Sequence, residues 1–138
     1  MRQEEPFMQG TQPAELQELE QLLSQLDERM QARVLCTVGA GTLQLPVHAI
    51  TLGNPAPEVP AVGYFGGVHG LERIGAAVVL AFLRSVLMRL RWDASLAHQL
   101  ERMRMVFMPV VNPGGLWFGT RANPRGVDLM RNAPVESG

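Results

Sequence analysis

His69 and Glu72 are the residues whose types and spacing could do chemistry. They lie three positions apart, after a glycine turn that separates the apolar run 61–65 from a second apolar run over 74–83. This order predicts a strand, a tight turn and a helix that begins near Gly70, with both side chains on one face of its first turn. Imidazole and carboxylate groups are both zinc ligands. The alternative is that Glu72 offsets the positive end of the helix and His69 is a loop residue.

A second polar segment follows another buried strand. The run 105–111 is almost wholly apolar, which is typical of a strand covered on both faces. It ends abruptly at Asn112, and polar residues continue to Asn132. Because functional sites in open α/β sheets form at the carboxyl ends of strands, the two segments are expected to share one cleft.

The elements that must position these residues follow from hydrophobic periodicity. A helix beginning at Pro13 has an apolar stripe that runs to Met30. Pro46 interrupts one strand and so predicts an edge strand or a bulge. We expect strands over 33–38, 42–52, 61–65 and 105–111, a buried helix over 74–91, a short helix over 93–103 and a strand-like piece over 126–129.

These elements predict an α/β fold, with a mixed, mostly parallel sheet and helices on both faces. Residues 1–12 are expected to form a flexible N-terminus, and residues 13–138 a single domain.

Composition excludes several classes of protein. The chain has 138 residues, of which 46% are hydrophobic and 18% charged, with a net charge of −1. No basic stripe suits nucleic acid or an anionic membrane, and no apolar run reaches the roughly 20 residues that span a bilayer. The single cysteine, Cys36, is expected in a buried strand interior and favours a reducing compartment, so we expect a cytoplasmic protein. His48 and His98 are interpreted as surface residues.

The polar segments resemble the ordered motifs of the zinc carboxypeptidase family, the M14 type, which includes related amino-acid deacylases. The similar segments are 67–72, then 111–115, then Arg121, and then 126–132. The resemblance covers roughly residues 33–134, which correspond to the amino-terminal part of the family's domain. It implies an incomplete carboxypeptidase-like domain, a Zn²⁺ cofactor and a peptide or acyl-amino-acid substrate.

The resemblance also implies a metal site. His69 would bind zinc through one ring nitrogen and Glu72 through its carboxylate. Asp128 matches the position that holds the other ring nitrogen of the ligand histidine, and so fixes the ring and its tautomer. For Asp128, the alternative is a turn or strand-end aspartate. The family's third ligand, a histidine, and its general-base glutamate are expected beyond this chain.

Substrate contacts are implied as well. Arg131 matches the arginine that binds a substrate carboxylate, and Arg121 matches the arginine that polarises the scissile carbonyl, with Arg125 as its competitor in the same loop. The alternative for Arg121 and Arg125 is a solvated loop arginine. Asn112 would shape the floor of the cleft. Met130 stands where the family usually has asparagine, and this departure puts ordinary carboxypeptidase specificity in doubt.

Three hypotheses follow. The first is a zinc hydrolase of the carboxypeptidase or deacylase type. The second is an inactive truncated fragment, or an interaction module of the same fold, since catalytic zinc sites use three protein ligands and this chain offers two. The third is a metal-free domain whose glycine turn meets an anion. No oligomeric state follows from the sequence.

Overall fold

The computed structural model describes residues 10–134. Most of the segment predicted to be flexible, residues 1–12, lies outside this range. The described helices are α1 (Ala14–Leu23), α2 (Arg73–Arg89), α3 (Ala94–Leu100) and α4 (Pro113–Phe118). The strands are β1 (Met30–Ala40), β2 (Leu43–Gly53), β3 (Ala61–Phe65) and β4 (Arg104–Met108).

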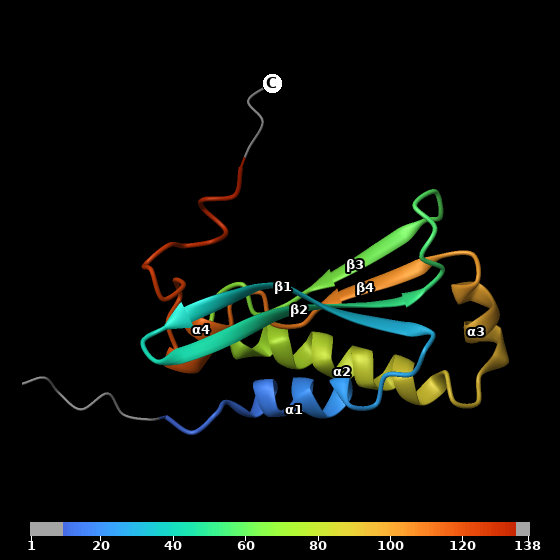
Figure 1. The fold of residues 1–138 in the computed structure, drawn as a ribbon, viewed down its shortest axis with the longest axis horizontal. Coiled ribbons are helices and arrows are strands. Elements are labelled where there is room, and N and C mark those ends of the chain that lie inside the picture. The colour runs from blue at the N-terminus through green and yellow to red at the C-terminus, as the bar shows by residue number, and fades with distance from the viewer. Residues whose placement is uncertain (1–9, 135–138) are drawn as a thin grey trace, which may run out of the picture.

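The four strands form one mixed sheet in the order β1-β2-β4-β3 (Figure 1). β1 and β2 form an antiparallel hairpin, β2 and β4 are also antiparallel, and β3 and β4 are parallel. The predicted α/β class with a mixed sheet is confirmed. The prediction that the sheet is mostly parallel is wrong for the described strands, because the short connection between β1 and β2 permits only an antiparallel pair.

Strand β2 lies inside the sheet, so the alternative that placed it at an edge because of Pro46 is wrong. Pro46 lies in the half of β2 that pairs only with β1, since β4 pairs with β2 from Ile50 onwards. The missing N–H of the proline therefore interrupts no β2–β4 hydrogen bond. A bulge does occur, but in β1, between Val34 and Cys36.

The main helices cover one face of the sheet. In Figure 1, α1 and α2 lie side by side below the strands. Helices on both faces were expected, but this view places the two long helices on the same face. Their facing side chains and those of β2 and β4 form the core, which contains Leu16, Leu19, Leu22, Ile50, Leu52, Ala76, Leu80, Leu83, Met105 and Phe107. Among residues 10–134, no helix is long and apolar enough to span a membrane.

Several sequence expectations differ from the structure. Cys36 is exposed rather than buried, because β1 is an edge strand. Helix α1 ends at Leu23, and Met30 begins β1 instead of continuing the helical stripe. No strand forms over 126–129; these residues lie in turns and irregular structure. Helix α2 is not buried on nearly every side, since part of its apolar surface is exposed.

Candidate metal site

A glycine-rich connection joins β3 to α2 and presents His69. Gly67 has φ +62°, a left-handed conformation that favours glycine. The Glu72 N–H donates to the His69 carbonyl at 3.1 Å, which closes a turn and brings the two side chains to the same side. Helix α2 begins only at Arg73, with Glu72 as its N-cap residue. The predicted juxtaposition is therefore produced by the turn before the helix, and not by the first helical turn.

The imidazole of His69 has a carboxylate at each ring nitrogen. Nδ1 lies 3.4 Å from Oε2 of Glu72, and Nε2 lies 3.0 Å from Oδ1 of Asp128. The side chain of His69 is 11% exposed and that of Glu72 55%. The ring is thus held from the protein side by Asp128, while Glu72 faces solvent. The predicted proximity of Asp128 to His69, across 59 residues of sequence, is present in the structure.

Asp128 also binds Arg121 and the backbone of its own loop. Its Oδ2 accepts from Nε of Arg121 at 2.8 Å, and its Oδ1 accepts from the N–H of Met130 at 3.1 Å. The hydrogen bond from Arg121, followed by that from His69, holds the pKa of the Asp128 carboxyl well below its ordinary value. An ionised Asp128 can only accept hydrogen bonds. Nε2 of His69 therefore carries the proton, and in the neutral ring Nδ1 has its lone pair directed towards Glu72.

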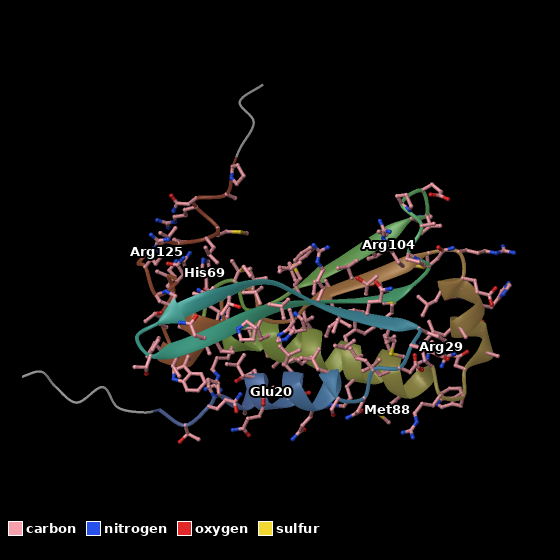
Figure 2. All side chains as sticks on the ribbon, in the orientation of Figure 1. Glu20, Arg29, His69, Met88, Arg104 and Arg125 are labelled. Carbon is pink, nitrogen blue, oxygen red and sulfur yellow. The ribbon has the colours of Figure 1, made fainter. Side chains whose placement is uncertain are left out.

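The positive charge of Arg121 lies beside both acidic groups of the site. Its guanidinium is 3.5 Å from Oε1 of Glu72 and is bonded to Asp128. Arg131 lies further out, with its Nε 3.8 Å from Oδ2 of Asp128 and its side chain 78% exposed. Arg125 shows no hydrogen bond or ion pair of its guanidinium within residues 10–134; its backbone N–H donates to Asn123. Of the two competing arginines, the structure brings Arg121 to the site (Figure 2 labels Arg125 and His69 at this end).

Asn112 is a buried side chain that connects the His69 loop to the start of α4. It is 2% exposed, and its Nδ2 donates to the Val68 carbonyl at 3.2 Å. Its Oδ1 accepts from the Gly115 N–H at 2.8 Å and so caps α4. This short helix was not predicted, although asparagine followed by proline at the first helical position is a start signal. The role of Asn112 in shaping the floor of a cleft stays a prediction; in the structure its two hydrogen bonds join the His69 loop to the start of α4.

A close backbone contact joins the two segments of the site. A Cβ atom at Gly70 would lie 1.8 Å from the backbone carbon of Gly115 and 2.1 Å from its oxygen. Only a residue without a side chain allows this approach. The N–H of Leu71 also donates to the Thr120 carbonyl at 3.1 Å. Sequence reasoning missed this role of Gly70, because a contact between residues 45 positions apart leaves no local signal.

The side chains of His69 and Glu72 together fit part of a zinc site. Zinc bonds of about 2.0 to 2.2 Å at tetrahedral angles place two ligand atoms about 3.3 to 3.5 Å apart. Nδ1 of His69 and Oε2 of Glu72 are 3.4 Å apart. Two acceptor groups facing each other at this distance require a proton or a cation between them. Within the described residues, no group of three or more His, Cys, Asp or Glu side chains could hold a metal. The pair could supply two positions of a zinc coordination shell, and such a shell would need a third protein ligand.

The other two histidines lie elsewhere. His48 faces the α1 side of β2, where its Nδ1 is buried without a hydrogen-bond partner among the described residues. Burial lowers the pKa of its imidazole. His98 lies on α3, with its Nδ1 3.1 Å from Oε2 of Glu101. Neither histidine approaches the site.

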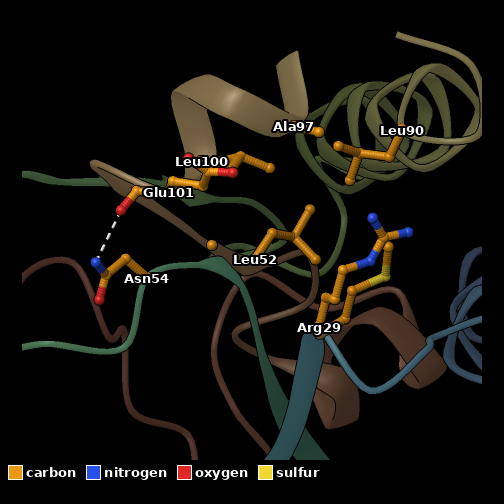
Figure 3. Close-up of a pocket in the computed structure, with 9 residues that line it drawn as sticks. Arg29, Leu52, Asn54, Leu90, Ala97, Leu100 and Glu101 are labelled. Atoms are coloured by element: carbon orange, nitrogen blue, oxygen red, sulfur yellow. Dashed lines mark hydrogen bonds between the residues drawn. The ribbon is translucent and has the colours of Figure 1, made fainter. Parts of the chain in front are cut away.

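A separate apolar cavity (Figure 3) lies near Arg29, at the end of the sheet opposite His69 (Figure 2). It has a volume of about 390 Å³ and is lined by residues from the ends of β1, β2 and α2 and from α3. Leu52, Leu90 and Leu100 form its walls, and Arg29 lies at its rim. The cavity shares no residue with the His69 cluster.

Comparison with known proteins identifies the family of the chain and its fold. The family model described as zinc carboxypeptidase matches residues 19–136. The chain is 28% identical over 103 residues to Carboxypeptidase SOL1 of Arabidopsis thaliana, covering 72% of this chain and 21% of that protein. It is 27% identical over 135 residues to Carboxypeptidase E of Caenorhabditis elegans, and the match covers 85% of this chain and 29% of that protein.

Solved structures share the fold. A metallo-carboxypeptidase from Burkholderia cenocepacia superposes with a TM-score of 0.68 at 22% identity, covering 86% of this chain and 32% of that one. Bovine thrombin-activatable fibrinolysis inhibitor, solved in complex with tick carboxypeptidase inhibitor, superposes with a TM-score of 0.59 at 18% identity. The match covers 82% of this chain and 37% of that one. The chain therefore spans between 21% and 37% of the length of these four proteins.

Proposed function

The chain belongs to the zinc carboxypeptidase family, and on that premise we propose that its His69 cluster is one half of the active site of a zinc-dependent peptide or amide hydrolase. The observation that carries the proposal is the pair of contacts of one imidazole, with Nδ1 at Glu72 and Nε2 at Asp128. That arrangement directs a free nitrogen lone pair at a carboxylate across a gap that suits zinc.

Each residue then has a defined task. His69 and Glu72 hold the metal, and Asp128 keeps the imidazole in the tautomer that leaves Nδ1 free. Zinc, when bound there, would lower the pKa of a water molecule and polarise the scissile carbonyl. Arg121, 3.5 Å from Glu72, holds a positive charge where the carbonyl oxygen becomes negative. Arg131, exposed at the outer side of the cluster, binds the substrate carboxylate.

The substrate side of the proposal is a peptide or an N-acyl amino acid. A free carboxylate is the feature common to both, and the guanidinium of Arg131 suits it. Met130, 68% exposed, cannot donate a side-chain hydrogen bond to that carboxylate. We therefore expect weaker carboxylate capture than with asparagine at this position. In a longer protein that carries the third ligand and the general base, Met130→Asn should raise hydrolysis of a substrate with a free carboxyl end more than that of its amidated counterpart; an equal change for both substrates would contradict this role of Met130.

We expect the 138-residue chain alone to be inactive, with the third ligand and the general base supplied by further polypeptide. Measured hydrolysis by the isolated chain, abolished by a chelator, would overturn this expectation. A cytoplasmic location remains part of the proposal, based on the single cysteine. Fractionation of cells that express the protein tests it, and recovery from the secreted fraction would contradict it.

The metal site can be tested on this chain with a matched pair of histidines. His98 and Glu101 also lie three residues apart with 3.1 Å between nitrogen and oxygen, but Asp128 braces only His69. In a competition assay with a chromophoric chelator, we expect weak zinc binding that His69→Ala abolishes and His98→Ala leaves unchanged. Asp128→Asn should weaken it about 10- to 100-fold. Zinc binding that survives His69→Ala would refute the proposed site.

A further inference from the structure

Arg121 contacts both carboxylates of the His69 cluster. Its guanidinium lies 3.5 Å from Oε1 of Glu72, and its Nε donates to Oδ2 of Asp128 at 2.8 Å. The other oxygen of Glu72, Oε2, is the one that faces Nδ1 of His69 across the gap of 3.4 Å. The carboxylate of Glu72 therefore lies between two positions for positive charge, which are the gap beside His69 and the guanidinium of Arg121.

The positive charge of Arg121 is permanent. A guanidinium does not lose its proton in a protein, so this charge cannot leave when another cation arrives. A divalent cation in the gap between His69 and Glu72 would bind beside a positive charge that stays in place. The side chain of Arg121 is 45% exposed, so solvent weakens the repulsion without removing it.

Asp128 has hydrogen-bond donors other than Arg121. Its Oδ1 accepts from Nε2 of His69 at 3.0 Å. The same oxygen accepts from the N–H of Met130 at 3.1 Å and from the N–H of Arg131 at 3.4 Å. Removing the guanidinium of Arg121 would leave these bonds in place, and with them the tautomer of His69 that directs Nδ1 towards Glu72.

Glu72 also has little need of Arg121 to stay near His69. The turn that joins these two residues is closed by the bond from the Glu72 N–H to the His69 carbonyl at 3.1 Å. The contact of Arg121 with Glu72 is a longer one, between side chains that are 45% and 55% exposed. Such a surface ion pair holds its partners only weakly. The charge of Arg121 should therefore matter more to a cation in the gap than its contribution to the arrangement of the ligands.

We propose that Arg121 opposes the binding of zinc by His69 and Glu72, and so lowers the metal affinity of the site. Glu72 and Asp128 contribute one negative charge each, and Arg121 cancels one of them. The inference rests on the proposed function, because it concerns the same metal site. The guanidinium that suits a carbonyl oxygen as it becomes negative makes the site less favourable for a cation.

The test is the zinc dissociation constant of the 138-residue chain, measured by competition with a chromophoric chelator. We expect Arg121→Gln to bind zinc about tenfold more tightly than the wild type, because it removes the charge and keeps a donor for Asp128. The gain should shrink at high salt, which screens the repulsion. Arg125→Gln is the matched control. It removes the same charge from the same loop, and the affinity should change by less than about twofold.

Three further variants separate the charge of Arg121 from its structural role. Arg121→Met, a second neutral substitution, should show the same gain as Arg121→Gln. Arg121→Lys keeps the charge and should bind zinc more weakly than either neutral variant. Arg121→Gln combined with His69→Ala should lose the gained affinity, because the gain belongs to the His69 site. Circular dichroism establishes that each variant is folded.

The outcomes distinguish this inference from the proposed function. Zinc binding that depends on His69 but is not tightened by either neutral variant overturns the inference and leaves the proposed metal site standing. An equal gain in Arg125→Gln or Arg121→Lys also overturns it, as does a gain that survives His69→Ala. Wild-type zinc binding that does not depend on His69 refutes the proposed site itself. An absence of zinc binding in both the wild type and the neutral variants refutes the two together.

Discussion

Replacing Asn112 with alanine tests how the floor of the site is held. Asn112 bridges two backbone groups, the Val68 carbonyl beside His69 and the Gly115 N–H at the start of α4. The side chain is 2% exposed, so water does not readily replace its amide. The substitution therefore removes the cap of α4 and leaves a carbonyl group of the His69 loop without a partner.

The expected loss of stability follows from these two bonds. Loss of an N-cap side chain costs about 0.5 to 2 kcal/mol. A buried group left unsatisfied costs about 1 to 3 kcal/mol. Together they predict a decrease of about 1.5 to 5 kcal/mol in the free energy of unfolding. With a urea m-value of about 2 kcal/mol/M, the midpoint of urea unfolding should fall by about 0.8 to 2.5 M.

Asn54→Ala provides the matched control. The Asn54 side chain also bridges two backbone groups, donating to the Glu101 carbonyl at 2.8 Å and accepting from the Ala56 N–H at 2.9 Å. The first of these bonds is exposed, so water can replace part of what is lost. We expect a loss of about 1 kcal/mol or less. If Asn112→Ala costs no more than Asn54→Ala, the role assigned to Asn112 as a buried brace is wrong.

Two further predictions concern backbone contact and pH. Gly70→Ala should destabilise the chain far more than Gly119→Ala, because a Cβ atom at position 70 would overlap the Gly115 backbone. Gly119 has φ +65° but open space around it, so its substitution should cost about 1 to 2 kcal/mol. Equal midpoints of urea unfolding for the two variants would contradict this reasoning. Burial lowers the folded-state pKa of His48, so the unfolded chain takes up its proton at higher pH and stability should fall as the pH drops below about 6.5. His48→Leu should weaken this dependence between about pH 6.5 and the lowered pKa, and an unchanged pH profile of thermal unfolding would refute it.

Local patterns in the sequence predicted much of the fold and the position of the site. The alternation of apolar residues located β2, and the apolar runs located β3 and β4, within a few residues. A short helix was expected over 93–103, and Asp93, at the start of that range, caps α3, since its Oδ1 accepts from the Leu96 N–H at 3.0 Å. These features depend on residues close together in the chain, which is why periodicity and capping preferences reveal them.

Local sequence patterns predicted burial and secondary structure less well at residues whose environment depends on elements distant in the sequence. The apolar surface of α2 suggested a helix buried on nearly every side, yet Ile74 and Val78 are exposed because no described element packs beyond β3. The strand-like pattern of residues 126–129 became a loop, because Asp128 binds His69 and Arg121 instead of joining the sheet.

The sequence by itself determined that His69 and Glu72 follow a strand and share one turn, because three residues of chain leave them little freedom to separate. It also determined family membership, through motifs in a fixed order. Only the tertiary structure decided which arginine reaches the site and how Asn112 and Gly70 let two distant loops meet. Those outcomes depend on contacts between segments dozens of residues apart. Such contacts are set by packing in three dimensions, and the periodicity of the sequence does not reveal them.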